Sequence, residues 1–142
     1  MKKIQIPFNN DIGLLILRVG LGLSMAANHG YGKIIGGPEK WAKTGAMMPS
    51  LGLEFMPLVW GFMASLAEFA CAILVIFGIL FRPALSLLIA TMTVAAFVHL
   101  NMPADSPRSG ISGASHALEF LVAFLALYAT GPGKYRLKIG SV

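Results

Sequence analysis

Charged residues are scarce in this chain: they make up 12% of its 142 positions, while apolar residues make up 56%. A soluble globular domain has about a quarter charged residues, so a folded chain of this composition has too little polar surface to face water. Cysteine is almost absent, and the single Cys71 excludes a disulfide within the chain. Because Cys71 lies in an apolar run, we interpret it as a packing residue. The composition therefore excludes a disordered or water-soluble protein and favours the lipid bilayer as the solvent.

The net charge of +5 does not indicate a nucleic-acid partner. Lysine and arginine lie at the edges of apolar runs and form no continuous basic face, which is typical of the flanks of membrane-spanning segments. We therefore predict contact with a bilayer and no binding of nucleic acid.

Four apolar runs are candidates for crossing a membrane, because a hydrocarbon core of about 30 Å needs about 20 helical residues. The last run has only 16 residues and would need its flanks to span. Arg82 alone separates the second run from the third, which predicts an antiparallel helical hairpin. We expect an all-α, antiparallel four-helix membrane bundle that forms one domain over residues 1–142. Its predicted spans are residues 12–31, 56–81, 83–100 and 115–130.

The longest connection, residues 32–55, contains a short candidate helix. Gly36, Gly37 and Pro38 open a stretch in which apolar residues recur at near-helical spacing. Trp41 in this stretch is typical of a side chain at headgroup depth. We predict a short interfacial helix here, in the first outer loop.

The first run could instead be a cleaved signal peptide, because two lysines precede it and Met25, Ala26 and Ala27 resemble a cleavage site. Arg18 inside the run and the run's full length favour a membrane helix. The distribution of basic residues then predicts a multi-pass protein of the inner membrane with both termini cytoplasmic. The cytoplasmic side would hold Lys2, Lys3, Arg82, Lys134, Arg136 and Lys138, and the other side Lys33, Lys40, Lys43 and Arg108.

Three ionisable residues, Arg18, Glu68 and Glu119, lie within the predicted spans. An isolated charge at the bilayer centre costs at least about 2.5 kcal/mol on insertion scales, so these side chains should face the bundle interior and meet partners. Counted along the helices, Arg18 lies about 9 Å and Glu68 about 12 Å from the inner surface. We therefore predict a buried ion pair between Arg18 and Glu68. Such a pair either takes part in chemistry or only fixes the register of two helices.

Three histidines and Glu119 are predicted to gather near the outer face. His29 and His99 end spans that run outward, and His116 opens the fourth span with Glu119 one turn later on the same side. Together they could ligate a transition metal, or relay protons to a bound redox molecule such as a quinone. Each histidine alone could equally satisfy a helix end or a loop carbonyl. We expect Glu119 to pair with His116, His29 or Lys33.

In their order and spacing, these residues resemble the DoxX/DoxD family of small four-helix membrane proteins. The first span is similar to the family's Arg, Gly and His-Gly-x-x-Lys pattern, and the following loop to its Leu-Gly-Leu turn. The second span has the family's mid-span glutamate and a basic residue at the hairpin. The matching positions are Arg18, Gly20, His29, Gly30, Lys33, Leu51, Gly52, Leu53, Glu68, Gly78, Arg82, His99, Glu119, Gly131, Pro132, Gly133, Lys134 and Leu137.

The resemblance implies a four-helix bundle with a shared polar pocket and redox chemistry. Family members are associated with quinone-linked oxidation of thiosulfate, with membrane oxidoreductase assemblies, or with responses to quinone and thiol stress. Cys71 replaces a residue that is usually smaller, and His116 has no recognised family counterpart, so the substrate stays open. The family's polar positions fall on Arg18, His29, Lys33, Glu68, His99 and Glu119.

Two functions remain open at this point. In the first, the chain is a redox-linked membrane subunit that a quinone or a small sulfur compound enters from the outer leaflet. Glu119 with His29, His99 or His116 would move the protons, while a membrane or periplasmic redox partner or a bound cofactor moves the electrons. In the second, the chain is a non-enzymatic assembly factor or a path for a small solute or proton. Four helices leave little room for a path through a monomer, so we expect a homo-oligomer.

Overall fold

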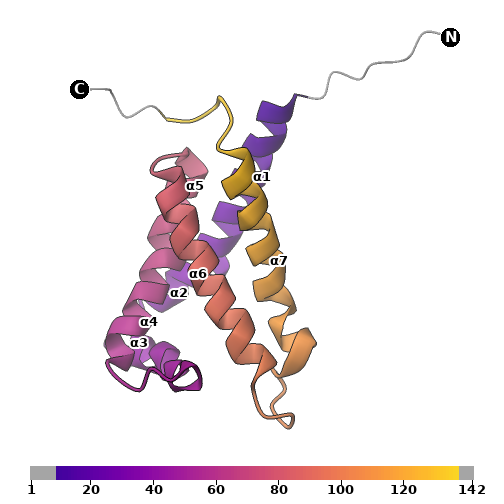
Figure 1. The fold of residues 1–142 in the computed structure, drawn as a ribbon. Coiled ribbons are helices and arrows are strands. Elements are labelled where there is room, and N and C mark those ends of the chain that lie inside the picture. Colours follow the sequence, from indigo (N-terminus) through magenta and orange to yellow (C-terminus); the bar gives the residue numbers. More distant parts are fainter. Residues whose placement is uncertain (1–8, 138–142) are drawn as a thin grey trace, which may run out of the picture.

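The computed structural model describes residues 9–137, which form an all-α bundle of four long helices (Figure 1). Each is long and apolar enough to cross a membrane, which confirms the predicted fold class. Large apolar side chains such as Ile16, Leu23 and Val122 are exposed on its sides, where lipid would cover them. The protein is a multi-pass membrane protein in contact with the bilayer. Its four spans are Asn10–Ile34, Pro57–Phe77, Phe81–Leu100 and Gly110–Thr130.

Two of these spans contain a π-helical turn, in which the helix is locally wider than an α-helix. In the first span the turn is η1, and in the second it is η3. The elements, in chain order, are α1 (Asn10–Met25), η1 (Ala26–Gly30), α2 (Tyr31–Ile34), α3 (Gly37–Gly45), the 3₁₀ turn η2 (Met48–Leu51), α4 (Pro57–Leu66), η3 (Ala67–Cys71), α5 (Ala72–Phe77), α6 (Phe81–Leu100) and α7 (Gly110–Thr130).

The boundaries of the later spans differ from the predicted ones for local reasons. The second span ends at Phe77 because Gly78 takes a left-handed conformation, with φ of 71°. The last span begins at Gly110, five residues earlier than predicted, and its 21 residues need no help from the flanks. Apart from Ile111, the residues of its first turn are small or polar, so the apolar run begins only after the helix has begun.

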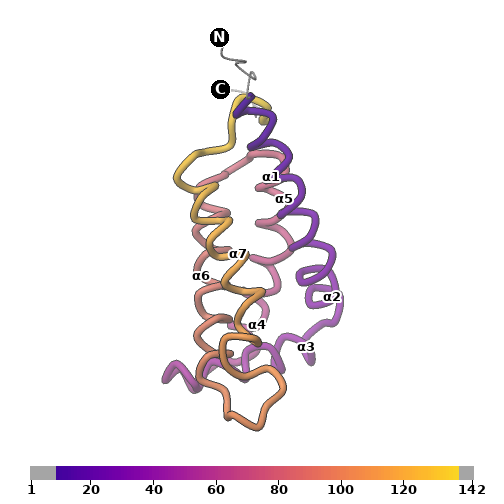
Figure 2. The backbone as a smooth tube through the Cα atoms, turned by 90° about the vertical axis from the view of Figure 1, so that its right-hand side faces the viewer, coloured from indigo at the N-terminus to yellow at the C-terminus, as the bar shows by residue number. Residues whose placement is uncertain are grey.

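Helix contacts are close where small residues allow them. α1 packs along α5, and α6 packs along α7 (Figures 1 and 2). Gly22 of α1 has no room for a side chain, because a Cβ there would lie 2.9 Å from the carbonyl oxygen of Ala72 and against Ile76. The side chains that are completely buried between the helices include Met25, Val75, Leu85, Leu88, Phe124 and Leu127.

Both ends of the described chain lie at the same end of the bundle, which we call the terminal end (Figure 1). There Asp11 accepts a hydrogen bond from the backbone N–H of Lys134 at 2.9 Å, and Leu137 donates to the carbonyl of Phe77 at 2.9 Å. The opposite end carries residues 35–56 and 101–109, and we call it the loop end. Lys2, Lys3 and Lys138 lie outside the described residues, so the cytoplasmic placement of the termini stays a prediction.

The short helix predicted between the first two spans is present as α3 (Gly37–Gly45). It packs directly on α4, where Gly45 approaches the carbonyl of Pro57 too closely for any side chain. Its Trp41 donates a hydrogen bond from Nε1 to the carbonyl of Lys33 at 2.9 Å, and its ring lies edge-on to Phe62. α3 is therefore docked onto the bundle and positions the end of the first span.

Candidate functional site

A cavity of about 690 Å³ lies in the loop-end half of the bundle, between the first two spans and the helices α6 and α7. Its walls are mainly apolar, with small side chains such as Ala64, Ala67 and Ala95 where larger ones would fill the space. Five methionines line it, and their flexible thioether side chains adapt to differently shaped apolar molecules. They are Met25, Met47, Met48, Met63 and Met92.

A buried ion pair closes one side of this cavity. Lys33 of α2 donates to both carboxylate oxygens of Glu68 in η3, with Nζ to Oε1 at 2.7 Å and Nζ to Oε2 at 2.6 Å. The Glu68 side chain is 4% exposed and the Lys33 side chain 27% exposed. Each charge neutralises the other in surroundings that would strongly disfavour either one alone.

The two π-helical turns produce this pairing by bringing the first two spans into close contact. η1 packs against η3, and Gly30 has no room for a Cβ, which would lie 2.6 Å from the Glu68 carbonyl carbon and the Phe69 Cα. η1 carries His29 and η3 carries Glu68. π-helical turns are frequent at functional sites because they re-aim side chains within an otherwise regular helix.

The predicted ion pair between Arg18 and Glu68 was wrong, although both side chains are buried as expected. Arg18 instead donates from Nη1 to the carbonyl of Pro132 at 2.9 Å, at the terminal end. Its guanidinium lies beside Gly78, ten residues after Glu68 and about 15 Å further along the span. Equal spacing along two helices does not give equal depth when the helices begin at different levels. The first span continues to Ile34, which lets Lys33 reach Glu68.

His29 and His116 meet across the cavity, which confirms that these two histidines gather. Their Nε2 atoms are 2.9 Å apart, so one ring donates its N–H and the other accepts it. The ring centroids are 4.8 Å apart, and both rings lie edge-on to Phe120 of α7. The pair therefore links η1 to α7 by one shared proton.

His99 also lines the cavity but does not join the other two histidines. Its Nδ1 lies 2.9 Å from the carbonyl oxygen of Arg108, in the loop that follows α6. A carbonyl can only accept, so Nδ1 carries a proton, and in the neutral imidazole Nε2 then holds the lone pair. His99 thus satisfies a loop carbonyl and retains one basic nitrogen.

The prediction that Glu119 faces the bundle interior was wrong. Glu119 is exposed, and within residues 9–137 it makes no ion pair or side-chain hydrogen bond with His116, His29 or Lys33. The reason is the buried stripe of α7. That stripe follows Ala117, Phe120, Phe124 and Leu127, so the position before Phe120 is turned away from the cavity.

The four predicted metal ligands are not brought together. In the part of the chain that the structure describes, no group of three or more histidine, cysteine or acidic side chains is arranged to hold a metal ion. Of the predicted set, only His29 and His116 touch, because Arg108 engages His99 and Glu119 is exposed.

Sequence reasoning missed the basic side chains of this cavity. Lys40, Lys43 and Arg108 all line it, together with Trp60 of α4. The three cations were counted only as flanks of the membrane spans. The sequence does contain a signal for them: all three lie in the two connections that an antiparallel bundle brings to the same end. Residues of these two connections can therefore reach the same cavity.

The DoxX family model matches residues 13–100, which include Arg18, His29, Lys33, Glu68 and His99. The match ends before α7, so His116 and Glu119 lie outside it. No curated protein and no solved structure matches the chain significantly. Since the match covers more than half of the sequence, this chain belongs to the DoxX family.

Proposed function

We propose that this DoxX family protein binds a quinone in the loop-end cavity and acts as the membrane component of a redox system. The observation that carries the proposal is a single cavity of about 690 Å³ in which apolar walls converge on two polar pairs, Lys33 with Glu68 and His29 with His116. Ligand pockets typically have volumes of about 300–1,000 Å³ and combine apolar walls with a few polar groups. A quinone matches both parts: its apolar tail suits the apolar walls, and the two carbonyl oxygens of its ring can accept hydrogen bonds from the polar pairs.

The polar pairs can supply the protons that quinone reduction requires. Reduction to the quinol takes up two electrons and two protons. The His29–His116 pair holds one shared proton at rest, and a further proton makes one ring an imidazolium that can donate to a quinone carbonyl. Lys33 can donate a hydrogen bond to the same kind of oxygen while it stays paired with Glu68. His99, with its basic Nε2, can accept the next proton from the loop end.

The cations at the loop end suit the electron donor. Lys40, Lys43 and Arg108 line the cavity and would attract a small sulfur oxyanion to it. The electrons then come from such a compound or from a membrane or periplasmic redox partner. Glu119 has no part in this scheme, since it lies outside the cavity.

Quenching of tryptophan fluorescence tests the proposal directly, because Trp60 lines the cavity. The full chain in lipid nanodiscs is titrated with a short-chain ubiquinone, in wild type and in Ala95→Phe, which places a large ring in the cavity wall. We expect saturable quenching in wild type and binding weaker by about tenfold or more in Ala95→Phe. Ala126→Phe, on the exposed side of α7 and outside the cavity, serves as the matched control and should bind as wild type does.

Two results would contradict the proposal. One is quenching that never saturates, and the other is equal affinity in Ala95→Phe and wild type. Either result would favour the non-enzymatic assembly or permeation role.

A further inference from the structure

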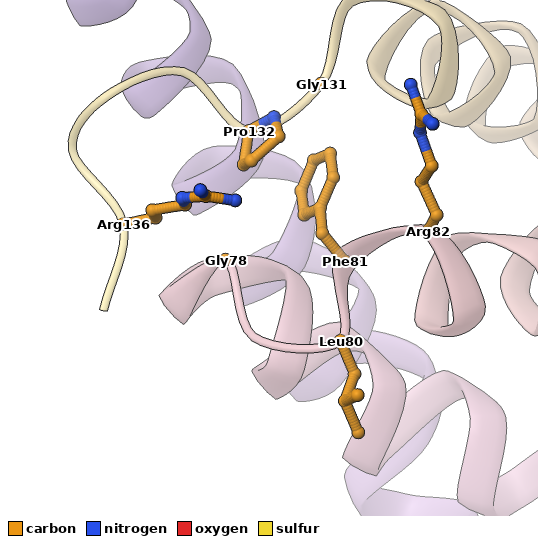
Figure 3. A pocket seen from close by; sticks show the side chains of 7 residues that line it. All are labelled: Gly78, Leu80, Phe81, Arg82, Gly131, Pro132 and Arg136. Carbon is orange, nitrogen blue, oxygen red and sulfur yellow. The ribbon is translucent and has the colours of Figure 1, made fainter. Parts of the chain in front are cut away.

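A second cavity lies at the terminal end, at the opposite end of the bundle from the proposed quinone site. Its volume is about 450 Å³. The hairpin between α5 and α6 forms one wall and the segment after α7 the other (Figure 3). The lining residues are Gly78, Leu80, Phe81, Arg82, Gly131, Pro132 and Arg136.

Arg18 contacts two residues of the cavity wall, Gly78 and Pro132, and has one donor without a partner among the described residues. Its side chain is 2% exposed, and Nη1 donates to the carbonyl of Pro132 in the cavity wall. Its Nε is buried and has no hydrogen-bond partner within residues 9–137. A buried N–H of a charged group without an acceptor is costly, so this atom indicates that an acceptor belongs nearby.

Arg82 and Arg136 line the cavity, and Arg18 contacts its wall. The Arg82 guanidinium also lies 5.9 Å from the centroid of the Tyr128 ring. The Nη1 of Arg18 and the Cβ of Arg136 lie 2.6 Å and 2.7 Å from one point, the position that a Cβ on Gly78 would occupy. Figure 3 shows the Arg136 guanidinium reaching past Pro132 into the space near Phe81, with Arg82 on the other side of that ring. The cavity and its wall thus carry several arginine charges in one region, and an anion bound there would lower their mutual repulsion.

No acidic side chain among the described residues lines this cavity to balance the three charges. Asp11, the carboxylate of the terminal end, binds Lys134 instead, through the backbone N–H at 2.9 Å and the ammonium at 3.6 Å. The N-terminus of α6 also lacks a side-chain cap. The partial positive charge of the helix dipole at that end therefore adds to the positive potential in the cavity. The carbonyls of Leu74, Val75 and Phe77 at the end of α5 already accept backbone hydrogen bonds.

We propose that the terminal-end cavity binds a phosphate group, with Arg136 and Arg82 as the groups that recognise it and Arg18 adding its charge from behind the Pro132 wall. Phosphate offers several acceptor oxygens and matches the planar fork of arginine. Its negative charge balances arginine charges that no acidic side chain lining the cavity among the described residues balances. The phosphate belongs either to the headgroup of an anionic phospholipid or to a free anion, since the cavity lies where the bundle leaves the bilayer.

Reconstituted full-length protein distinguishes these sources. Wild type, Arg136→Gln and the control Lys134→Gln are placed in nanodiscs of phosphatidylcholine with or without a minor fraction of phosphatidylglycerol. Retained lipid is measured by native mass spectrometry, and binding of inorganic phosphate in pure phosphatidylcholine discs by ³¹P line broadening. Arg136 is exposed, and Lys134 lies at the same end outside the cavity, so both variants should fold.

We expect one of the two probes to bind wild type and Lys134→Gln equally, and to bind Arg136→Gln about tenfold more weakly. Selective retention of phosphatidylglycerol identifies the headgroup as the source, and ³¹P broadening identifies the free anion. The proposal is overturned if wild type binds neither probe, or if Arg136→Gln binds the same probe as tightly as wild type. Arg82→Gln provides an independent check with the same expected direction.

Discussion

Removing Lys33 should destabilise the bundle more than neutralising Glu68 does. Lys33→Met leaves a carboxylate whose side chain is 4% exposed, whereas Glu68→Gln leaves an ammonium on a side chain that is 27% exposed and can reach water. Breaking a buried ion pair by removing one partner costs about 3–5 kcal/mol, and we expect Lys33→Met in this range. For Glu68→Gln we expect about 2 kcal/mol, because the remaining charge is partly solvated and the amide still accepts a hydrogen bond.

The double variant Lys33→Met/Glu68→Gln removes both charges and should be more stable than Lys33→Met alone. The coupling free energy between the two sites is expected to be about 3 kcal/mol, which exceeds the cost of Glu68→Gln alone. The free energy of unfolding is measured by steric trapping in bicelles for the wild type, both single variants and the double variant. Equal costs for the two single variants, together with strict additivity in the double variant, would refute the claim that each charge is stabilised by the other.

Three further predictions concern single positions. Gly45→Ala should lower the free energy of unfolding by about 1–3 kcal/mol and release α3 from α4, which proteolysis of the first loop would detect. Gly20→Ala is the control, because nothing lies within 4 Å of the added Cβ, and it should be neutral or stabilising. Gly78→Ala should lower the free energy of unfolding by at least about 1 kcal/mol, because its φ is 71° and Arg18 leaves no room for a Cβ. Thermal unfolding measures this, and unchanged stability would contradict it. Acidification that protonates both His29 and His116 should abolish their N–H···N bond, since both Nε2 atoms become donors, and a ¹⁵N coupling that persists in acid would contradict this.

Hydropathy and length were enough to predict the four spans, because burial in lipid requires long apolar helices. The loop helix was predictable from its Gly-Gly-Pro opening and the near-helical spacing of its apolar residues. Hydropathy and length could not place the start of α7, since Gly110 to Ala114 are mostly small or polar and join the helix without adding to the apolar run. The two π-helical turns also left no sequence signal. Their positions follow from how η1 and η3 pack against each other, which is a tertiary property.

The candidate site was predictable in its residue types and less so in its pairings. His29 and His116 were expected to meet and do so, and Lys33, Glu68 and His99 line the same cavity. The partner of Glu68 was missed because depth was counted from assumed membrane surfaces, whereas the first span continues through η1 and α2 to Ile34. The prediction for Glu119 failed because its one-turn spacing from His116 shows only that both lie on the same side of the helix. The spacing does not show which of them is closer to the buried stripe, and Glu119 is turned away from the cavity.

The most direct measurement of the central claim is photolabelling of the nanodisc-embedded protein with an azidoquinone, followed by mass spectrometry of the labelled peptides. The account predicts label on residues that line the loop-end cavity, such as Met63, Met92 and Trp60, with labelling suppressed by excess unmodified quinone and by Ala95→Phe. Label confined to the lipid-facing sides or the terminal end, or label that excess quinone does not reduce, would contradict it.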